Sequence, residues 1–250
     1  MPSRSLTVHC SAVERASMET GRHLDLGADI HIHFATLTSL VPLTEHYRDL
    51  LDAAELARLE RFKFEVDEQR FLLGHGFLRE VLGRYMERAA RSVGFERGPY
   101  GKPVVPGASF HFNLSDTKDA VAVAICANME LGVDVETVDR NVDHINVGQH
   151  YFTVEEQASI VEADDGKRRF LEFWTRKEAV LKASGVGIMD DLRVLRVDQA
   201  ENRMMITHDV FIAMAAPEYH VRTWAVDATH IVSLATPQRT TGIKFFGVPG

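Results

Sequence analysis

The stretch 173-FWTRKEAVLKASG-185 decides how this chain is organised. Apolar and charged residues alternate along it, and no proline or glycine occurs before Gly185, so it predicts an amphipathic helix that ends at a glycine cap. Glu178 and Lys182 are four residues apart and therefore leave the same face of that helix. Taken alone, such a pair is most simply an exposed ion pair that contributes little to stability.

A second stretch, residues 131–137 (LGVDVET), suggests a functional role for that helix face instead. Its apolar residues predict a strand on which Asp134 and Glu136 are two positions apart, so their carboxylates share one face. Taken by themselves, two acids on a strand are most simply interpreted as solvated side chains on an exposed face of the sheet. Together with Glu178 on the helix, however, they predict an oxygen-rich site suited to Mg²⁺ and a phosphate.

The composition is that of an ordinary soluble globular protein, with 250 residues of which 45% are hydrophobic and 26% charged. The formal net charge of −8 argues against general nucleic-acid binding. With only Cys10 and Cys126, we expect no disulfide framework and a cytoplasmic location. The chain has no run of ~18 apolar residues, so no membrane span is expected. Residues 1–27 lack the apolar core of a signal peptide and are expected to form a loosely ordered extension.

The first half of the chain predicts strands and helices in a definite order. Expected are strands at 30–37, 110–115 and 120–127, a helix beginning after residue 52, and a long helix at 66–86. Asp52 and Glu55 have the spacing of a capping box, and the helix that they begin carries Arg58 and Arg61. Residues 94–108 are dense in glycine and proline, which predicts an irregular loop holding Lys102 on a stiffened turn.

Two further assignments concern single side chains. His31 and His33 share one face of the first strand, but no third soft ligand accompanies them, so we interpret them as a polar sheet face and not as a metal site. Trp174 is expected in the core near the seam between the halves, because indole is large and seldom left in water. Lys177 is assigned to the surface.

The second half repeats the order of the first. Strand 131–137 corresponds to strand 31–37, and Thr153 with Glu156 repeats the capping-box spacing. Arg169-Phe170-Leu171 then corresponds to Arg70-Phe71-Leu72, and Glu178-Ala179-Val180-Leu181 to Arg79-Glu80-Val81-Leu82. Four matches in one order predict a duplicated strand–helix–helix–strand unit, and hence an α+β protein made of two similar α/β subdomains.

We expect an extension at 1–27, an N-terminal subdomain at 28–129, a C-terminal subdomain at 130–236 and a loose tail at 237–250. Residues 192–198 and 219–235 should supply the closing strands. A cleft between two packed halves is a common ligand site. Because the acids begin the second half, while Arg58, Arg61, Arg70 and Lys102 belong to the first, we expect a polyanion to lie across the seam.

Together these motifs resemble the Sfp-type 4'-phosphopantetheinyl transferases, two-lobed enzymes that move phosphopantetheine from coenzyme A to a serine of a carrier protein. The resemblance runs from about residue 30 to residue 235. It rests on Gly101-Lys102-Pro103, Phe112-Asn113-Leu114-Ser115, Leu131-Gly132-Val133-Asp134-Val135-Glu136, and Phe173-Trp174 followed by Lys177-Glu178-Ala179 and Lys182. The last two motifs at this separation are highly specific, whereas Gly-Lys-Pro alone is weak.

The resemblance implies a role for each matching residue. Asp134, Glu136 and Glu178 resemble the ligands of Mg²⁺, with Mn²⁺ as the alternative ion. The residues expected to contact coenzyme A are Arg58, Arg70, Lys102, Pro103, Ser115, Asp116 and Lys182. Glu178 and Lys182 are the expected catalytic pair, with Glu178 taking the proton of the attacking serine and Lys182 stabilising charge on the diphosphate.

Asp116 is a departure from the family pattern, in which a histidine usually follows Asn-x-Ser and reaches the diphosphate. A carboxylate beside a phosphate is repulsive unless it is protonated, turned away or bridged by a cation. We therefore expect coenzyme A binding to be retained but altered. Loss of activity is the less favoured outcome.

The resemblance also implies the partners. The second substrate should be an acyl or peptidyl carrier protein, and the transferase itself is expected to be a monomer without nucleic-acid or membrane partners. Two alternatives stay open from the residues alone. One is a Mg²⁺-dependent phosphodiesterase or nuclease, because two nearby acids and a distant third also suit metal-assisted hydrolysis. The other is a degenerate relative that binds carrier proteins without turnover.

Overall fold

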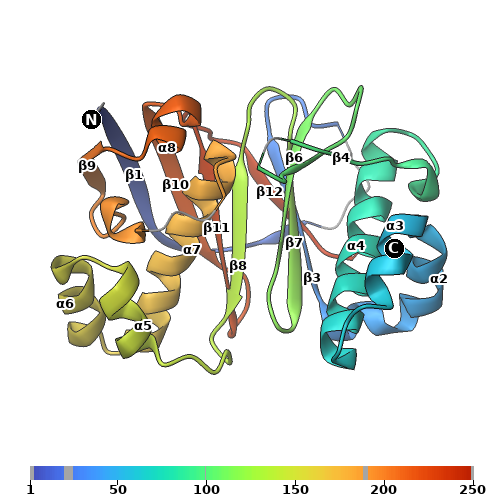
Figure 1. Ribbon diagram of the computed structural model, residues 1–250, viewed down its shortest axis with the longest axis horizontal. Helices are drawn as coiled ribbons and strands as arrows, with labels where there is room; N and C mark the ends of the chain where they lie inside the picture. Colours follow the sequence, from blue (N-terminus) through green and yellow to red (C-terminus); the bar gives the residue numbers. More distant parts are fainter. Residues whose placement is uncertain (1–2, 20–24, 99, 188–190, 249–250) are drawn as a thin grey trace.

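The computed structural model describes residues 3–19, 25–98, 100–187 and 191–248 and has a mixed α+β fold (Figure 1). Sheet A contains, in spatial order, β8 (Gly132–Thr137), β11 (His230–Thr236), β10 (Glu218–Ala225), β1 (Arg4–Arg15) and β9 (Glu201–Ile206). Sheet B contains β2 (Met18–Glu19), β12 (Ile243–Phe246), β3 (Ile30–Thr36), β7 (Ala120–Cys126) and β6 (His111–Asp116). A short pair, β4 (Glu96–Arg97) and β5 (Pro103–Val104), lies in the Gly/Pro-rich loop.

The helices fall into two groups, one for each sheet (Figure 1). The first group is α1 (Leu37–Leu40), α2 (Thr44–Leu50), α3 (Ala53–Leu59) and α4 (Glu65–Tyr85). The second is α5 (His144–Tyr151), α6 (Val154–Glu162), α7 (Gly166–Ser184) and α8 (Asp209–Met214). Single 3-10 turns occur at η1 (Val41–Leu43), η2 (Ala90–Ser92) and η3 (Leu192–Val194). Within the described residues, no helix is both long and apolar enough to cross a membrane.

Local sequence signals explain where the principal helices begin and end. Both predicted capping boxes are formed, by Asp52 with Glu55 at α3 and by Thr153 with Glu156 at α6. Helix α7 ends as predicted at Gly185, whose φ of 74° is the left-handed conformation that glycine adopts without strain. Gly132 is needed for a different reason, because a Cβ there would clash with the carbonyl oxygen of Ala179. Because glycine has no Cβ, β8 can lie directly against α7 at this position.

Three apolar clusters hold the layers together. One joins sheet A to α6, α7 and α8, and a second joins sheet B to α1, α2 and α4. A third lies between the two sheets and includes Ile32, Ala122, Val133, Val232 and Trp224. The sheets therefore pack face to face through this third cluster, with helices on their outer sides.

The two ends of the chain cross over between the sheets. Residues 1–27 were expected to be a loose extension, but Arg4–Arg15 form β1, which pairs in parallel with β10 and antiparallel with β9 inside sheet A. Conversely, part of the expected loose tail forms β12, which pairs in parallel with β3 in sheet B. Both expectations are wrong for these segments, because strand pairing with distant residues orders them.

Three smaller expectations can be compared with the structure, and one of them is wrong. The closing strands expected at 219–235 are present as β10 and β11, whereas 192–198 contains the turn η3 and no strand. His31 and His33 are buried, and both imidazoles hydrogen-bond the Tyr85 hydroxyl, at 2.7 and 2.8 Å. Burial lowers the pKa of His33 to about 3, so this imidazole is neutral at physiological pH.

Candidate active site

The three predicted acids lie on two elements that touch. Asp134 and Glu136 project from the same face of β8 and are each only 6% exposed. Glu178 is half-buried on α7, the helix that Gly132 allows to approach β8. The acids therefore meet because a strand with two-residue periodicity faces a helix at close range.

Lys182 and Ser115 complete a hydrogen-bonded cluster around Asp134. The Lys182 ammonium, one turn after Glu178, donates to Asp134 Oδ1 at 2.7 Å and to Ser115 Oγ at 2.8 Å. The Ser115 hydroxyl in turn donates to Asp134 Oδ1 at 2.9 Å and accepts from the Val135 amide at 3.2 Å. Because Ser115 belongs to β6 and Asp134 to β8, the cluster joins sheet B to sheet A.

Residues that the sequence analysis did not single out complete the site. Thr117, which follows Ser115 at a two-residue spacing, donates to Glu136 Oε2 at 2.9 Å. Arg140 forms an ion pair with Glu136 Oε1, and Asn113 accepts from the Val133 amide at 2.8 Å. The alternation Asn113, Ser115, Thr117 was a signal that could have revealed this row, because residues two apart on a strand share one face.

Burial shifts the pKa values of all three acids upward, and the charge of Asp134 adds to the shift for Glu136 and Glu178. Burial raises the pKa of Asp134, and the nearby Lys182 ammonium opposes that shift. Burial, followed by the charge of Asp134, raises the pKa of Glu136 to about 7 and that of Glu178 to about 7. A nearby positive charge would therefore stabilise the ionised form of each acid in this group.

The donor set fits a divalent cation, although the side chains are not arranged around one. Asp134 Oδ2 is buried and has no hydrogen-bond partner, so one oxygen is available for a ligand. The ligand oxygens of Asp134, Glu136 and Glu178 do not all lie within 4.8 Å of one another. Lys182 and Arg140 neutralise two of the acids in this arrangement, so sharing an ion would require side-chain rotation.

A groove of about 570 Å³ lies on the sheet B side, between α3, α4 and the Gly/Pro-rich loop. Arg58, Arg61 and Arg97 line it together with Phe71 and Pro103. The Arg58 guanidinium lies over the Phe71 ring, 4.6 Å from its centroid. Asp52 and Glu55 also line the groove, but their carboxylates pair with Arg79. In the described part of the chain, neither Arg58 nor Arg61 forms an ion pair with a carboxylate, so these two guanidinium groups are available to an anion.

Lys102 and Arg70, the other two predicted contacts to the anion, lie elsewhere. The Lys102 ammonium donates to Glu130 at 2.6 Å and to the carbonyl oxygens of Leu131 and Lys182 at 3.1 and 3.2 Å. A phosphate contact from Lys102 would require these bonds to be exchanged. Arg70 pairs with the Asp116 carboxylate at 3.1 Å, so a positive charge already offsets the acid that departs from the family pattern.

Lys177, assigned to the surface by the sequence analysis, is fully buried. Its ammonium pairs with the equally buried Glu156 at 2.7 Å and also donates to the carbonyl oxygens of Tyr151 and Leu192. Trp174 is partly buried and stacks on Phe170. The surface assignment of Lys177 is wrong because the alternation of charged and apolar residues does not reveal which charge meets a partner in the core.

Two family models match the chain in succession. The model described as "4'-phosphopantetheinyl transferase, N-terminal" matches residues 42–128, and the model of the 4'-phosphopantetheinyl transferase superfamily matches residues 130–235. The boundary between the two matches falls just before β8, where the acids begin.

Named relatives agree with these matches. The 4'-phosphopantetheinyl transferase HetI of Nostoc sp. is 31% identical over 160 residues, which cover 59% of this chain and 68% of HetI. A putative 4'-phosphopantetheinyl transferase of Synechocystis sp. is 31% identical over 163 residues (63% of this chain, 66% of the relative), and psf-1 of Bacillus pumilus is 31% identical over 147 (58% and 62%). The alignments thus span about two thirds of these relatives' lengths. With these likenesses and the matched motifs, the chain belongs to the 4'-phosphopantetheinyl transferase superfamily.

Proposed function

We propose that the protein transfers the 4'-phosphopantetheine arm of coenzyme A to a serine of an acyl or peptidyl carrier protein and releases 3',5'-ADP. The observation that carries this proposal is the cluster of Asp134, Glu136, Glu178, Lys182 and Ser115 where β6, β8 and α7 meet. The arginine-lined groove lies on the sheet B side and suits the nucleotide end of the same substrate. Membership of a family of transferases supports the same reaction.

The reaction requires the serine oxygen to attack a phosphorus of the diphosphate while 3',5'-ADP leaves. Glu178 is proposed to accept the serine proton, directly or through a bridging water, because it lies on α7 beside Asp134 and one turn before Lys182. Lys182 is proposed to turn one hydrogen bond from Asp134 to a phosphate oxygen and so to stabilise its charge. Positioning and charge neutralisation dominate this class of displacement.

Asp134, Glu136 and Glu178 are proposed to hold Mg²⁺, or alternatively Mn²⁺. When bound, the cation supplies positive charge to the diphosphate oxygens. The buried, unpartnered Asp134 Oδ2 supports this role. The raised pKa values of Glu136 and Glu178 are consistent with this role, because their causes are burial first and the negative charge of Asp134 second.

The Arg70–Asp116 pair bears on the departure from the family pattern. Arg70 Nε lies 3.1 Å from Asp116 Oδ2, and both side chains are partly exposed. We propose that this ion pair turns the carboxylate away from the diphosphate, so that Asp116 weakens coenzyme A binding less than its charge alone would. Arg70 then acts on the substrate through Asp116.

A transfer assay tests the function. The purified chain is incubated with coenzyme A, MgCl₂ and an apo carrier protein, and the mass of the carrier is measured. We expect a gain of one phosphopantetheine arm with release of 3',5'-ADP, and no gain in EDTA or with a carrier that lacks its acceptor serine. Consumption of coenzyme A without modified carrier would favour a phosphodiesterase. Carrier binding with neither product would favour a non-catalytic relative.

Arg58→Ala is expected to raise the KM for coenzyme A by about tenfold or more with little change in kcat, the size of one lost hydrogen bond to a charged group. Arg58 lines the groove without a carboxylate partner among the described residues, which leaves its charge for the 3'-phosphate. The measurement is steady-state transfer with coenzyme A and with 3'-dephospho-coenzyme A. Arg48→Ala, which removes an arginine paired with Glu68 outside the groove, is the control.

The dephosphorylated substrate makes this assignment specific. If Arg58 contacts the 3'-phosphate, wild type and Arg58→Ala should have similar KM values for 3'-dephospho-coenzyme A. An equal loss with both substrates would place Arg58 at another part of the ligand.

We also propose that the two halves arose by duplication of one strand–helix–helix–strand unit, and that a cleft lies between them. The support for the duplication is that each sheet carries a capping-box helix followed by a longer helix, α3 with α4 and α6 with α7. The domain boundaries, the monomeric state and the cytoplasmic location stay predictions from the sequence.

A further inference from the structure

A second group of ligand-type side chains lies away from the candidate active site. A cavity of about 590 Å³ is lined by residues of β1, β10 and β11 and by residues 239–241, which lead into β12. His9, Glu218 and His220 lie in its wall, on the sheet A side. None of the three takes part in the hydrogen bonds of the acidic cluster described above.

Strand register fixes these three side chains on one face. In the parallel pair β1–β10, His9 is the direct Cα partner of His220, and Thr7 is that of Glu218. Glu218 and His220 are two residues apart on β10, so they share the face on which His9 lies. Val8 and Val221, the neighbours of opposite parity, point instead into the core of sheet A.

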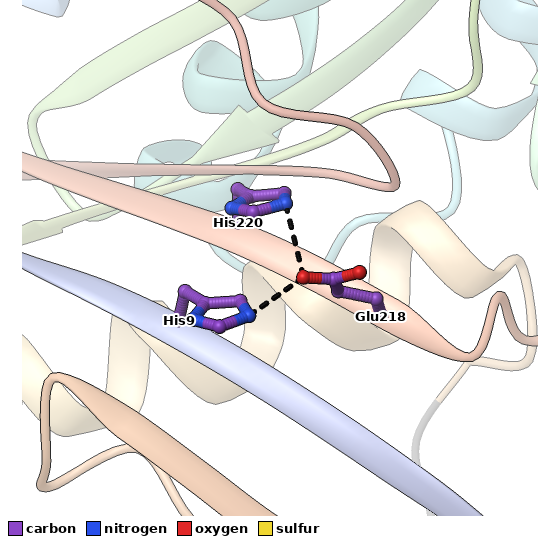
Figure 2. A group of neighbouring side chains, drawn as sticks. All are labelled: His9, Glu218 and His220. Carbon is purple, nitrogen blue, oxygen red and sulfur yellow. Dashed lines mark hydrogen bonds and ion pairs between the residues drawn. The ribbon is translucent and has the colours of Figure 1, made fainter.

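The donor atoms converge, as Figure 2 shows: both imidazole rings are turned toward one carboxylate oxygen of Glu218. His9 Nε2 lies 2.6 Å from Glu218 Oε1, and His220 Nε2 lies 3.5 Å from the same oxygen. The two imidazoles are stacked with centroids 4.8 Å apart and planes inclined by 11°. One ligand atom from each residue lies within 4.8 Å of the others, and no other such trio of His, Cys, Asp or Glu occurs among the described residues.

These spacings are close to those that a metal requires. Ligands about 2.0–2.1 Å from a tetrahedral Zn²⁺ lie about 3.3 Å from one another. The two separations from Glu218 Oε1 lie on either side of that value. Because the imidazoles are stacked nearly parallel, at least one ring must also rotate to direct its nitrogen lone pair at a shared ion. Two neutral imidazoles and a carboxylate are also a set that first-row transition metals prefer over Mg²⁺.

We propose that His9, Glu218 and His220 bind one Zn²⁺ ion or a similar first-row divalent ion, with the fourth position open to the cavity. The charges nearby permit it. Arg222 is paired with Glu14 at 2.8 Å. Burial first, and the positive charge of the exposed Arg239 as a smaller cause, lower the pKa of His220, which keeps this imidazole in the neutral form that binds a metal. The site would cross-link β1 to β10, and so fasten the first strand of the chain to a sheet otherwise built from its second half.

The test uses the full chain, from which metal is first removed with EDTA and the EDTA is then removed by dialysis. Excess MgCl₂ is added so that Mg²⁺ occupies the acidic cluster of Asp134, Glu136 and Glu178. The protein is then titrated with ZnCl₂ in competition with a chromogenic chelator. We expect one Zn²⁺ per chain and a higher melting temperature with Zn²⁺. His9→Gln, His220→Gln and Glu218→Gln should each weaken Zn²⁺ binding by at least about tenfold, since even outer-shell changes at metal sites cost this much. His46→Gln, at a histidine distant in sequence on α2, is the control.

Circular dichroism without metal checks that each variant is folded, and at least one of the three substitutions should pass because Glu218→Gln preserves shape. Visible absorption of bound Co²⁺ gives a second readout, expected in wild type and His46→Gln and lost in the folded variants. Binding of less than one Zn²⁺ per chain, or equal affinity in wild type and folded variants, would overturn the proposal and leave a simple His9–Glu218 ion pair.

Discussion

Glu178→Gln is expected to reduce phosphopantetheine transfer by about 10²–10⁴-fold, the usual contribution of a positioned general base. Glutamine has nearly the shape of glutamate but cannot accept the serine proton, and it is a poorer ligand for a hard cation. Single-turnover mass analysis of the carrier at saturating coenzyme A measures the loss. Glu162→Gln, at an exposed glutamate that ends α6, is the matched control and should retain wild-type rates.

The same substitution should not harm the fold. Burial raises the pKa of Glu178 from 4.5 to about 7, so the folded state binds this proton more tightly than the unfolded state does. The ionised carboxylate therefore destabilises the folded state increasingly as pH rises from about 4.5 to 7, and the effect is complete above that range. Without added metal, Glu178→Gln should melt at or above the wild-type temperature at pH 8. Near-normal turnover in this variant would remove Glu178 from the mechanism.

Lys177→Met is expected to lower the free energy of unfolding by about 3–5 kcal/mol, the cost of leaving a buried charge without its partner. Both side chains of the Lys177–Glu156 pair are fully buried, with 2.7 Å between Nζ and Oε2. The substitution leaves the Glu156 carboxylate without its counter-ion, although the amides of Thr153 and Val197 still donate to it, and removes the Lys177 donor from two carbonyl oxygens. Urea unfolding followed by circular dichroism gives the measurement.

Two variants sharpen this prediction. Lys167→Met removes a lysine at the start of the same helix, for which no ion pair is found among the described residues, and should change stability little. Adding Glu156→Gln to Lys177→Met should recover part of the loss, because no uncompensated charge then remains in the core. A loss below ~1 kcal/mol for Lys177→Met, the range of exposed ion pairs, would contradict the assignment.

The elements predicted best were those specified by local signals. The capping boxes at Asp52 and Thr153 and the glycine after α7 fix helix ends through contacts within four residues, so the sequence alone located them. The closeness of Asp134 and Glu136 followed from strand periodicity in the same way. Glu178 was joined to them as the third carboxylate of an oxygen-rich site, and the resemblance to a known family supported that grouping.

The errors arose where a residue's partner is distant in sequence. Nothing within residues 4–15 states that β10 will pair with them, and nothing near Lys177 identifies Glu156 as its counter-ion. The Arg70–Asp116 pair is of the same kind, because its members come from α4 and β6. Periodicity reports which face a side chain occupies, but only the assembled fold determines what lies opposite that face.

The crossing of the chain ends has a consequence for biosynthesis. β1 is translated before both of its partners, β9 and β10, and most of the described chain lies between them; β3 likewise pairs with β7 on one side but with the much later β12 on the other. Neither sheet can be completed until these later strands have been translated, so the final cooperative step should come late in folding. For the same reason, deleting β1 would damage the sheet built from the second half of the chain, and deleting β12 would damage the sheet that contains β3.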